Sequence, residues 1–561
     1  MKLNLILSAA ILAGSSLLSV AQTHKEGVEY YRADQLSNAK ELLQRNYNNA
    51  GTDKAVSEYY LGLIALDNNN IAEAQDHFNK GVSLNPDYAL NYVGLAEIAL
   101  RNGDKKGAET FFKDAKSHAG KEKDEKASLD IAIARAYYNV DPTLYAKEID
   151  KNLAQAQKDS PKQGTAYTNA DIYLFEGDRK RDLKDFGGAG NQYEMATTYN
   201  PNATEAYVKY AELFTQVNPQ YAINMLNNLL RVNPQSALGQ RELAKAYLNA
   251  KDYKNAVAQY EKYVKNPNHF KDDEVQLAYL LFVDGDYQQG YDFATQLLNQ
   301  NPDNFTAQRF QFLNAANIDA LKDQMLPMAE ALIAANKAKP DTNKFAQIDY
   351  ILITPELLSA NRPEEAQALV EQAIANDPEN PEYYRILATV YTKEKDFVKT
   401  AQAYDQYIEK KEKPGYNDIV QQARYNYYAG ASQLIDNPEL SQQLLNKATD
   451  VADQALAISA DYPTPYIIKG QAAIALAPTD QDRLSAAVPF YTQAMEIIES
   501  SSDPSRYTSD LRDLYTYLGN YYLQDQNDIP SAIPYFEKYV ELTPNDQDTK
   551  AYIETLKSKV K

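Results

Sequence analysis

The chain has 561 residues, a net charge of −20 and no cysteine or tryptophan. The absence of cysteine excludes disulfides, zinc–thiolate sites, cysteine nucleophiles and attachment of a lipid to an N-terminal cysteine. The acidic balance argues against binding to nucleic acid or to an anionic membrane, because both require basic patches. A single compact core seldom supports a chain of this length, whereas an array of repeats extends its core along one axis.

Residues 1–21 have the pattern of a secretory signal peptide. Lys2 supplies the positive start, an apolar stretch follows, and Ser19 and Ala21 frame a small-x-small cleavage site that leaves Gln22 as the first residue. An uncleaved membrane anchor is the alternative, but the stretch is short and weakly apolar for a stable span. No later stretch approaches a membrane-spanning length, so we expect an exported bacterial protein that is periplasmic, outer-membrane-associated or secreted.

A repeat of about 34 residues runs through the rest of the chain. Repeats of this length indicate helical hairpins that bury their apolar faces only by stacking on one another. Three well-preserved copies place large and small residues in one order: Tyr92, Ala96, Ala99, Ala108, Phe112 and Ala115; Gln240, Ala244, Tyr247, Ala256, Tyr260 and Tyr263; Tyr384, Ala388, Tyr391, Thr400, Tyr404 and Tyr407.

This order resembles the tetratricopeptide repeat (TPR) family, in which a large residue precedes Leu-Gly or Leu-Ala, then Tyr, Ala, Phe or Tyr, Ala and a closing Pro. The resemblance implies an all-α, right-handed superhelical solenoid, and we expect about 13 or 14 helical hairpins. In one copy, Gly62 is predicted to lie where the two helices of a hairpin cross closely, since a larger side chain would separate them.

Turn signals agree with the phase of the repeat. An Asp or Asn that can cap the second helix of a hairpin recurs at one phase, at Asn70, Asp104, Asp252, Asp286 and Asp396. A residue followed by proline closes second helices, because the residue before a proline avoids helical geometry. These pairs are Asn85-Pro86, Asn200-Pro201, Asn233-Pro234, Asn301-Pro302, Asp377-Pro378 and Thr543-Pro544.

The predicted organisation is a signal peptide at 1–21, an N-terminal array at 22–340, a C-terminal array at 341–545 and a capping helix at 546–561. The charged residues of that last helix suit a solvent-facing cap on the final core layer. Repeat boundaries stay open in residues 305–345 and 411–485, where the pattern is irregular. The second of these stretches contains two long helical segments and an insertion at 475–485.

No pattern of catalytic, metal-binding or cofactor-binding residues stands out. The four histidines are isolated, and no two of them share a helix face at the spacing of a metal site. No glycine-rich phosphate loop follows a strand, and neither a Ser-His-Asp trio nor a carboxylate pair is singled out. We therefore expect no enzyme, no cofactor and no metal.

In the TPR family the first helices of successive repeats line a concave surface, so the resemblance implies a peptide-binding groove. The groove-facing positions here are Val56, Tyr59, Leu63, Leu90, Val93, Glu97, Val208, Glu212, Arg241, Lys245, Tyr279 and Phe282. The family's Lys, Asn and Arg clamp for carboxylate tails is absent. Contact between turns of the same solenoid is the alternative role for the apolar positions, and both roles stay open.

The predicted function is a non-catalytic scaffold that binds a protein or peptide partner in the bacterial cell envelope, as part of an envelope complex. The alternative is a glycan- or nutrient-binding protein of the outer membrane or periplasm on a TPR-like frame. The 45 tyrosines offer aromatic faces for sugars, but most of those in the clear repeats occupy positions that the repeat core fills, and the absence of tryptophan weakens this alternative further. The sequence identifies neither the partner nor the oligomeric state.

Overall fold

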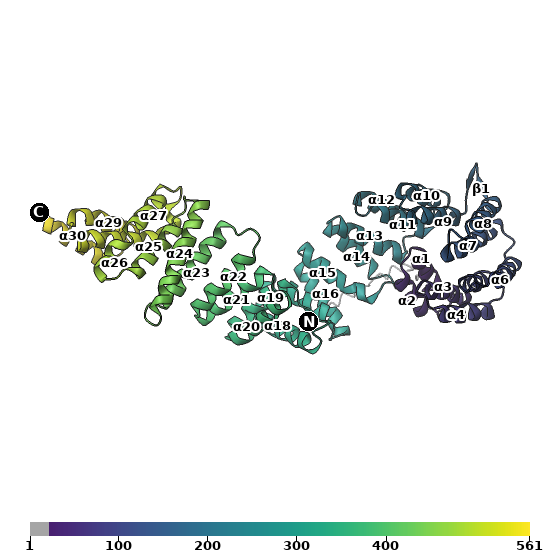
Figure 1. The fold of residues 1–561 in the computed structure, drawn as a ribbon, viewed down its shortest axis with the longest axis horizontal. Coiled ribbons are helices and arrows are strands. Elements are labelled where there is room, and N and C mark those ends of the chain that lie inside the picture. The colour runs from purple at the N-terminus through teal and green to yellow at the C-terminus, as the bar shows by residue number, and fades with distance from the viewer. Residues whose placement is uncertain (1–21, 561) are drawn as a thin grey trace, which may run out of the picture. The chain divides into compact units, whose positions relative to one another are not determined.

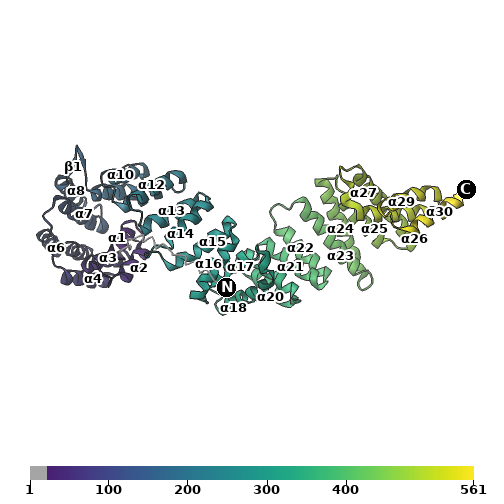
Figure 2. The ribbon, with the colours of Figure 1, turned by 180° about the vertical axis from the view of Figure 1, so that it is seen from behind.

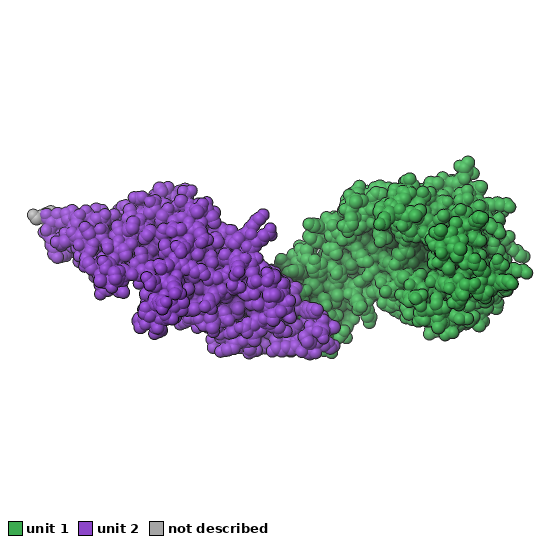
Figure 3. Space-filling view, in the orientation of Figure 1, with its two compact units in different colours: residues 1–314 green, residues 315–561 purple. Residues whose placement is uncertain are grey.

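The computed structural model describes residues 22–560, so the predicted signal peptide at 1–21 lies outside the described residues. The chain divides into two compact units, residues 1–314 and residues 315–561 (Figure 3). The sequence predicts a boundary after residue 340, less than one repeat from this position.

Unit 1 contains helices α1 to α16, a two-stranded antiparallel hairpin and a 3-10 turn (Figure 1). The bounds are α1 (His24–Arg32), α2 (Leu36–Arg45), α3 (Lys54–Asp67), α4 (Ile71–Leu84), α5 (Leu90–Arg101), α6 (Lys105–Ser117), α7 (Lys123–Val140), α8 (Ala146–Asp159), β1 (Lys162–Gln163), β2 (Ala166–Tyr167), α9 (Ala170–Asp182), α10 (Phe186–Tyr199), α11 (Thr204–Phe214), α12 (Pro219–Val232), α13 (Ala237–Asn249), α14 (Tyr253–Tyr263), η1 (Lys271–Asp273), α15 (Glu274–Asp284) and α16 (Tyr287–Gln300). Helix α17 (Phe305–Ala315) ends at the boundary between the units.

Unit 2 contains helices α18 to α30, with short 3-10 or π segments between some of them. The bounds are η2 (Asp319–Gln324), α18 (Met325–Ala338), α19 (Gln347–Ser359), α20 (Pro363–Asn376), α21 (Pro381–Glu394), α22 (Phe397–Lys410), α23 (Tyr416–Ser432), α24 (Pro438–Ile458), α25 (Thr464–Leu476), α26 (Asp480–Ala486), α27 (Val488–Ser500), η3 (Pro504–Tyr507), α28 (Thr508–Asn520), η4 (Tyr521–Asp525), α29 (Ile529–Leu542) and α30 (Gln547–Val560).

The helices follow the predicted solenoid of hairpins. Within residues 22–560, α1 to α16 form eight packed hairpins in unit 1, and α19 to α29 form five in unit 2 once the short helix α26 is set aside. Helix α30 follows as the predicted cap. The irregular stretch after residue 411 holds the predicted long helices, since α23 has 17 residues and α24 has 21. The predicted insertion is α26, which lies between the paired helices α25 and α27.

The predicted caps are confirmed. The side chain of each Asp or Asn at the capping phase accepts a hydrogen bond from a backbone N–H in the first turn of the helix that it precedes, as the free N–H groups there require. Each of the six residues that precede a closing proline is the C-cap of a second helix.

Small residues let the helices of unit 1 approach closely around large rings. A Cβ atom added to Gly62 would lie 2.4 Å from Cε1 of Phe78, and one added to Gly94 would lie equally close to it. Phe78 is fully buried between these two glycines, which belong to α3 and α5. The predicted close crossing at Gly62 is therefore confirmed.

Replacing Gly62 with valine should destabilise unit 1 by roughly 1–3 kcal/mol, because Phe78 has no space into which to move. Gly187→Ala is the matched control, since a Cβ there meets no atom within 4 Å. The control should be neutral or should stabilise by up to about 1 kcal/mol, through helix propensity. Chemical denaturation of both variants measures the difference, and equal stabilities would contradict the packing argument.

Unit 1 curls back on itself. Helix α1 packs against α11 and α13, whose residues lie far along the chain, and the two ribbon views agree on this placement (Figures 1 and 2). We call the closed arrangement of α1 to α13 the ring, and the contact of the first hairpin with residues 204–274 the seam. The first helices α1, α3, α5, α7, α9 and α11 face the inside of the ring.

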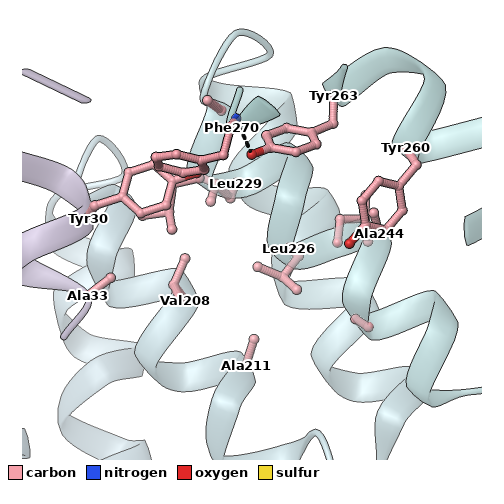
Figure 4. Packing of buried hydrophobic residues seen from close by; sticks show 14 of the residues in the cluster. Tyr30, Ala33, Val208, Ala211, Leu226, Leu229, Ala244, Tyr260, Tyr263 and Phe270 are labelled. Carbon is pink, nitrogen blue, oxygen red and sulfur yellow. Dashed lines mark hydrogen bonds between the residues drawn. The ribbon is translucent and has the colours of Figure 1, made fainter. Parts of the chain in front are cut away.

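An apolar cluster holds the seam together (Figure 4). The ring of Tyr30 packs edge-on against Phe270, with centroids 5.3 Å apart, and Val208 lies in the same cluster. The backbone N–H of Phe270 donates a hydrogen bond of 3.1 Å to the hydroxyl oxygen of Tyr263. The first hairpin is therefore part of the core of the sixth to eighth hairpins.

Polar contacts flank this cluster. Arg45 donates a hydrogen bond of 3.0 Å to the carbonyl oxygen of His269, and the guanidinium of Arg45 also lies over the ring of Phe270. Asn46 donates to the side-chain oxygen of Asn268 over 3.3 Å. Because these bonds join residues of the second helix to the loop after α14, they extend the seam beyond α1.

Candidate binding cavity in unit 1

A cavity of about 560 Å³ lies inside the ring. The first helices of the opening six hairpins all contribute to its wall, which joins a charged side to a tyrosine-rich side. Its volume falls in the range of sites that bind small molecules or single side chains. The face of unit 1 that is turned to the viewer in Figure 3 is hollowed.

Asp178 is the centre of the charged side. Its carboxylate lies 2.7 Å from Nζ of Lys209 and 2.9 Å from Nη2 of Arg135, and it also accepts a hydrogen bond from the hydroxyl of Tyr193. Burial by itself raises the pKa of Asp178, but Lys209 and Arg135 outweigh burial and hold that pKa well below its ordinary value. Asp178 is therefore ionised in the folded protein at neutral pH.

Asp34 connects this centre to the first hairpin. Its carboxylate lies 2.7 Å from Nη1 of Arg181 and 3.1 Å from Nζ of Lys209. The side chain of Lys209 is only 4 % exposed, so its charge depends on Asp34 and Asp178 for compensation. The ion pairs thus bridge α9, α11 and the segment that follows α1.

A second group of charges lies beside the first. The guanidinium of Arg32 lies 2.7 Å from Oε1 of Glu205 and also pairs with Asp171, to which Ser128 donates a hydrogen bond of 2.6 Å. Burial opposes ionisation of Asp171, but Arg32 and Ser128 lower its pKa below the ordinary value. Arg32 therefore ties α1 to both α9 and α11.

Three tyrosines from α1 and α3 form the other side of the cavity. Tyr60 meets Tyr31 and Tyr59 edge-on, with ring centroids 5.2 and 5.1 Å away. The hydroxyl of Tyr31 donates a hydrogen bond of 3.1 Å to Asp67. Tyr59 is 6 % exposed, and within residues 22–560 its hydroxyl has no hydrogen-bond partner.

Three of the predicted groove residues line the cavity: Tyr59, Leu63 and Leu90. Glu97 is buried nearby, where it pairs with Arg101 at 2.7 Å, and burial raises its pKa to about 7. Val93 is buried in the apolar core, and Val56 is half-buried on the first turn of α3.

The structure does not bring the other predicted groove residues to the cavity. Val208 lies in the core of the seam, and Arg241 pairs with Asp273 and donates a hydrogen bond to Gln35 of the first hairpin. Val208 and Arg241 thus make contacts between turns of the same solenoid, which is the alternative role considered for the apolar groove positions. The remaining positions lie elsewhere on unit 1: Glu212 is exposed, Lys245 pairs with Glu242, Tyr279 packs on Phe310 and Phe282 on Tyr287. Their role in peptide binding stays a prediction.

The charged residues of the cavity were not predicted from the sequence. Arg135, Asp178 and Lys209 lie on first helices, where the repeat otherwise places apolar or small residues on the inner side. A charged residue at an inner position of a first helix is the sequence signal that could have identified them. Burial of an unpaired charge is unfavourable, so each such residue requires a partner on a neighbouring helix.

Two carboxylates of α1 lie at the seam. Burial raises the pKa of Glu26 to about 7, against the opposing effect of the backbone N–H groups of Ala237 and Leu238. Burial, followed by the charges of Glu26 and Glu205, raises the pKa of Glu29 to about 8. Both groups therefore bind protons more tightly in the folded chain than in the unfolded chain.

The stability of the seam should consequently fall as the pH rises from about 5 to 8, because the folded state binds more protons than the unfolded state in this window. Glu29→Gln should reduce this loss of stability between pH 5 and pH 8 by on the order of 2 kcal/mol. Hydrogen exchange of α1 at pH 5 and pH 8 measures how the stability of the seam changes with pH, and Glu364→Gln at an exposed position is the control. An identical pH dependence in wild type and Glu29→Gln would disprove the role of Glu29.

Within the described range 22–560, no group of three or more His, Cys, Asp or Glu side chains is placed to hold a metal ion. No helix in that range is both long enough and apolar enough to cross a membrane.

Residues 59–123, 213–269 and 355–417 match the model of the tetratricopeptide repeat family. Among solved structures, the C-terminal part of a TPR repeat-containing protein from Cytophaga hutchinsonii is 15% identical, covers 50% of this chain and 98% of its own, and has a TM-score of 0.40. Yeast Tom70 is 15% identical with coverages of 96% and 95% and a TM-score of 0.27. Scores this low support no statement about partners. No curated protein matches the sequence.

Proposed function

Because the chain is a tetratricopeptide-repeat protein, we propose that it is a non-catalytic scaffold that binds a protein or peptide partner through the inner side of unit 1. Tetratricopeptide repeats generally mediate contacts between proteins. The observation that carries the proposal is the cavity inside the ring, whose wall includes Tyr59, Leu63 and Leu90 from the predicted groove.

The proposed place of action is the bacterial cell envelope. The pattern of residues 1–21 supports export, with cleavage before Gln22. N-terminal sequencing of the protein from its host, after separation of cytoplasm and envelope, tests this part. An envelope protein that begins at Gln22 is the expected result, and a cytoplasmic protein that retains Lys2 would contradict it.

The binding proposal is tested by capture of partners from envelope extract on the immobilised full chain. Leu90→Glu places a carboxylate on the cavity wall, whereas Leu84→Glu makes the same change at an exposed site on the neighbouring helix α4. Wild type and Leu84→Glu should retain the same partner, and Leu90→Glu should lose it. Equal retention by all three proteins would remove the cavity from the binding surface, provided that circular dichroism shows equal helicity.

A further inference from the structure

The geometry points to a binding site for an organic cation on the α3 wall of the cavity: an ammonium or guanidinium group carried on an aliphatic stem. The inference deepens the proposed function, because it names the chemical group through which the partner is held. The inference rests on the proposed function in one respect: the proposed protein partner supplies the cation, as a lysine or arginine side chain.

The charges that line the cavity do not balance. Its wall carries the carboxylates of Asp34, Asp67, Asp171, Asp178 and Glu205 against the cations of Arg32, Arg135 and Lys209, and Arg181 next to the wall pairs with Asp34. One carboxylate remains in excess. Four of these carboxylates pair with cations of the chain, as described above. Asp67 differs, because within residues 22–560 no Lys, Arg or His lies within salt-bridge distance of it. Asp67 accepts a hydrogen bond from the Tyr31 hydroxyl but pairs with no cation of the described residues, so it is the carboxylate that a ligand cation can neutralise.

The cations of the chain are already engaged elsewhere. Arg135 pairs with Asp178 and lies over the ring of Phe175, 5.3 Å from its centroid. Arg32 is held between Asp171 and Glu205. Movement of Arg32 to Asp67 would leave Asp171 and Glu205 without their cation, and movement of Arg135 would remove one of the two cations that pair with Asp178, so either movement is costly. An external cation can pair with Asp67 without such a loss.

Tyr59, Leu63 and Asp67 form a stripe on one side of α3 that winds gently around the helix. They are four residues apart, so they lie one above another on successive turns, and the stripe is about 12 Å long. All three side chains line the cavity. A polar hydroxyl, an apolar side chain and an exposed carboxylate in this order match a ligand whose cationic end lies at Asp67 and whose stem crosses Leu63.

The tyrosines add a second, independent indication of a ligand. The hydroxyl of Tyr59 has no partner within the described part of the chain, although the residue is more than nine-tenths buried and borders the cavity. The Tyr59 oxygen is not among the fully buried, unpaired polar atoms of the described residues, so it is open to the cavity and available to hydrogen-bond a ligand there. The rings of Tyr31 and Tyr60 also border the space, and aromatic faces attract cations.

Isothermal titration of the proposed mature chain, residues 22–561, tests the inference. The probes are agmatine, N-acetyl-lysine amide, a short peptide containing one lysine, and the same peptide with its lysine acetylated. We expect saturable binding of the unmodified peptide that weakens with added salt, and at least tenfold weaker binding of the acetylated peptide, because acetylation removes the charge that pairs with Asp67.

Asp67→Asn should weaken binding of the unmodified peptide by roughly tenfold or more, and Tyr59→Phe by a few-fold, since the latter removes only the hydroxyl. Both substitutions preserve shape, so circular dichroism should be unchanged. Asp303→Asn, which alters an exposed carboxylate in the loop before α17, is the control and should bind as wild type.

The probes also separate the possible sources of the cation. Binding of the peptide but not of agmatine assigns the site to a protein partner, whereas tight binding of agmatine assigns it to a free amine. Binding of neither probe, or equal binding by wild type and Asp67→Asn, would overturn the inference. If an envelope partner is still captured in that case and is lost on Leu90→Glu, the proposed function stands without it.

Discussion

Replacing Asp178 with alanine should destabilise unit 1 by about 3–5 kcal/mol, which is the usual consequence of removing one partner from a buried ion pair. The substitution leaves Lys209, whose side chain is 4 % exposed, with Asp34 as its remaining carboxylate. It also removes the acceptor of the Tyr193 hydroxyl and the partner of Arg135. Chemical denaturation of the full chain, with hydrogen exchange of α9 and α11 to locate the effect, measures the loss.

Asp150→Ala is the control for that experiment. Asp150 is 68 % exposed and lies 3.7 Å from Arg179, so its removal should change stability by less than about 1 kcal/mol. The double variant Asp178→Leu/Lys209→Met should recover part of the loss, because it removes a buried cation together with a carboxylate. A loss from Asp178→Ala no larger than that from Asp150→Ala would show that the ion pairs contribute little to the ring.

Tyr30→Ala should open the seam. Tyr30 is fully buried and packs on Phe270, and truncation of a buried aromatic side chain costs about 3–5 kcal/mol. Because Tyr30 joins the first hairpin to residues 204–274, the loss should fall on the contact of α1 with α11 and α13 more than on the hairpins themselves. Hydrogen exchange should therefore accelerate in α1 and at the inner faces of α11 and α13, while the exchange of α3 and α9 changes little.

Tyr552→Ala provides the comparison, since Tyr552 is 45 % exposed and lies in α30 of unit 2. It should leave the exchange of α1 unchanged and reduce stability by no more than about 1 kcal/mol. Uniform acceleration throughout unit 1 in Tyr30→Ala would contradict a local opening, because it would mean that the ring unfolds as one block.

The hairpins were predictable because their signals are local. Asp104 caps α6 through a bond to the backbone N–H of Gly107, only three residues away, and Asn85 ends α4 because Pro86 follows it. The close crossing at Gly62 is equally local, since it concerns two helices of the same hairpin. The repeat length, the capping residues and the closing prolines all agree in phase. The all-α solenoid could therefore be derived from the residues alone.

The closure of the ring could not be derived in this way. The contact of Tyr30 with Phe270 depends on small rotations between successive hairpins, which add up over many repeats, and no residue pattern in α1 identifies α13 as its neighbour. For the same reason the sequence named Val208 and Arg241 as candidate groove positions but did not show that they lie at the seam, where the structure places them.

The cavity was predictable only in part. Tyr59, Leu63 and Leu90 were selected because they occupy inner positions of the first helices, and these positions do line it. The pairing of Asp178 with Lys209 could not be predicted, because the sequence shows each charge but not which neighbouring helix carries its partner. Charge partners across repeats depend on side-chain geometry, which the repeat period leaves undetermined.

The seam has a consequence for the order of events during synthesis. The hairpin α1/α2 leaves the ribosome first, but the residues that complete its packing, 204–274, are translated much later. At ordinary elongation rates this interval is on the order of 10 to 50 s. During that time Tyr30 lacks Phe270 and Asp34 lacks both Arg181 and Lys209. The earliest-made hairpin is thus among the last to mature, and a nascent chain truncated before residue 270 should expose it to protease.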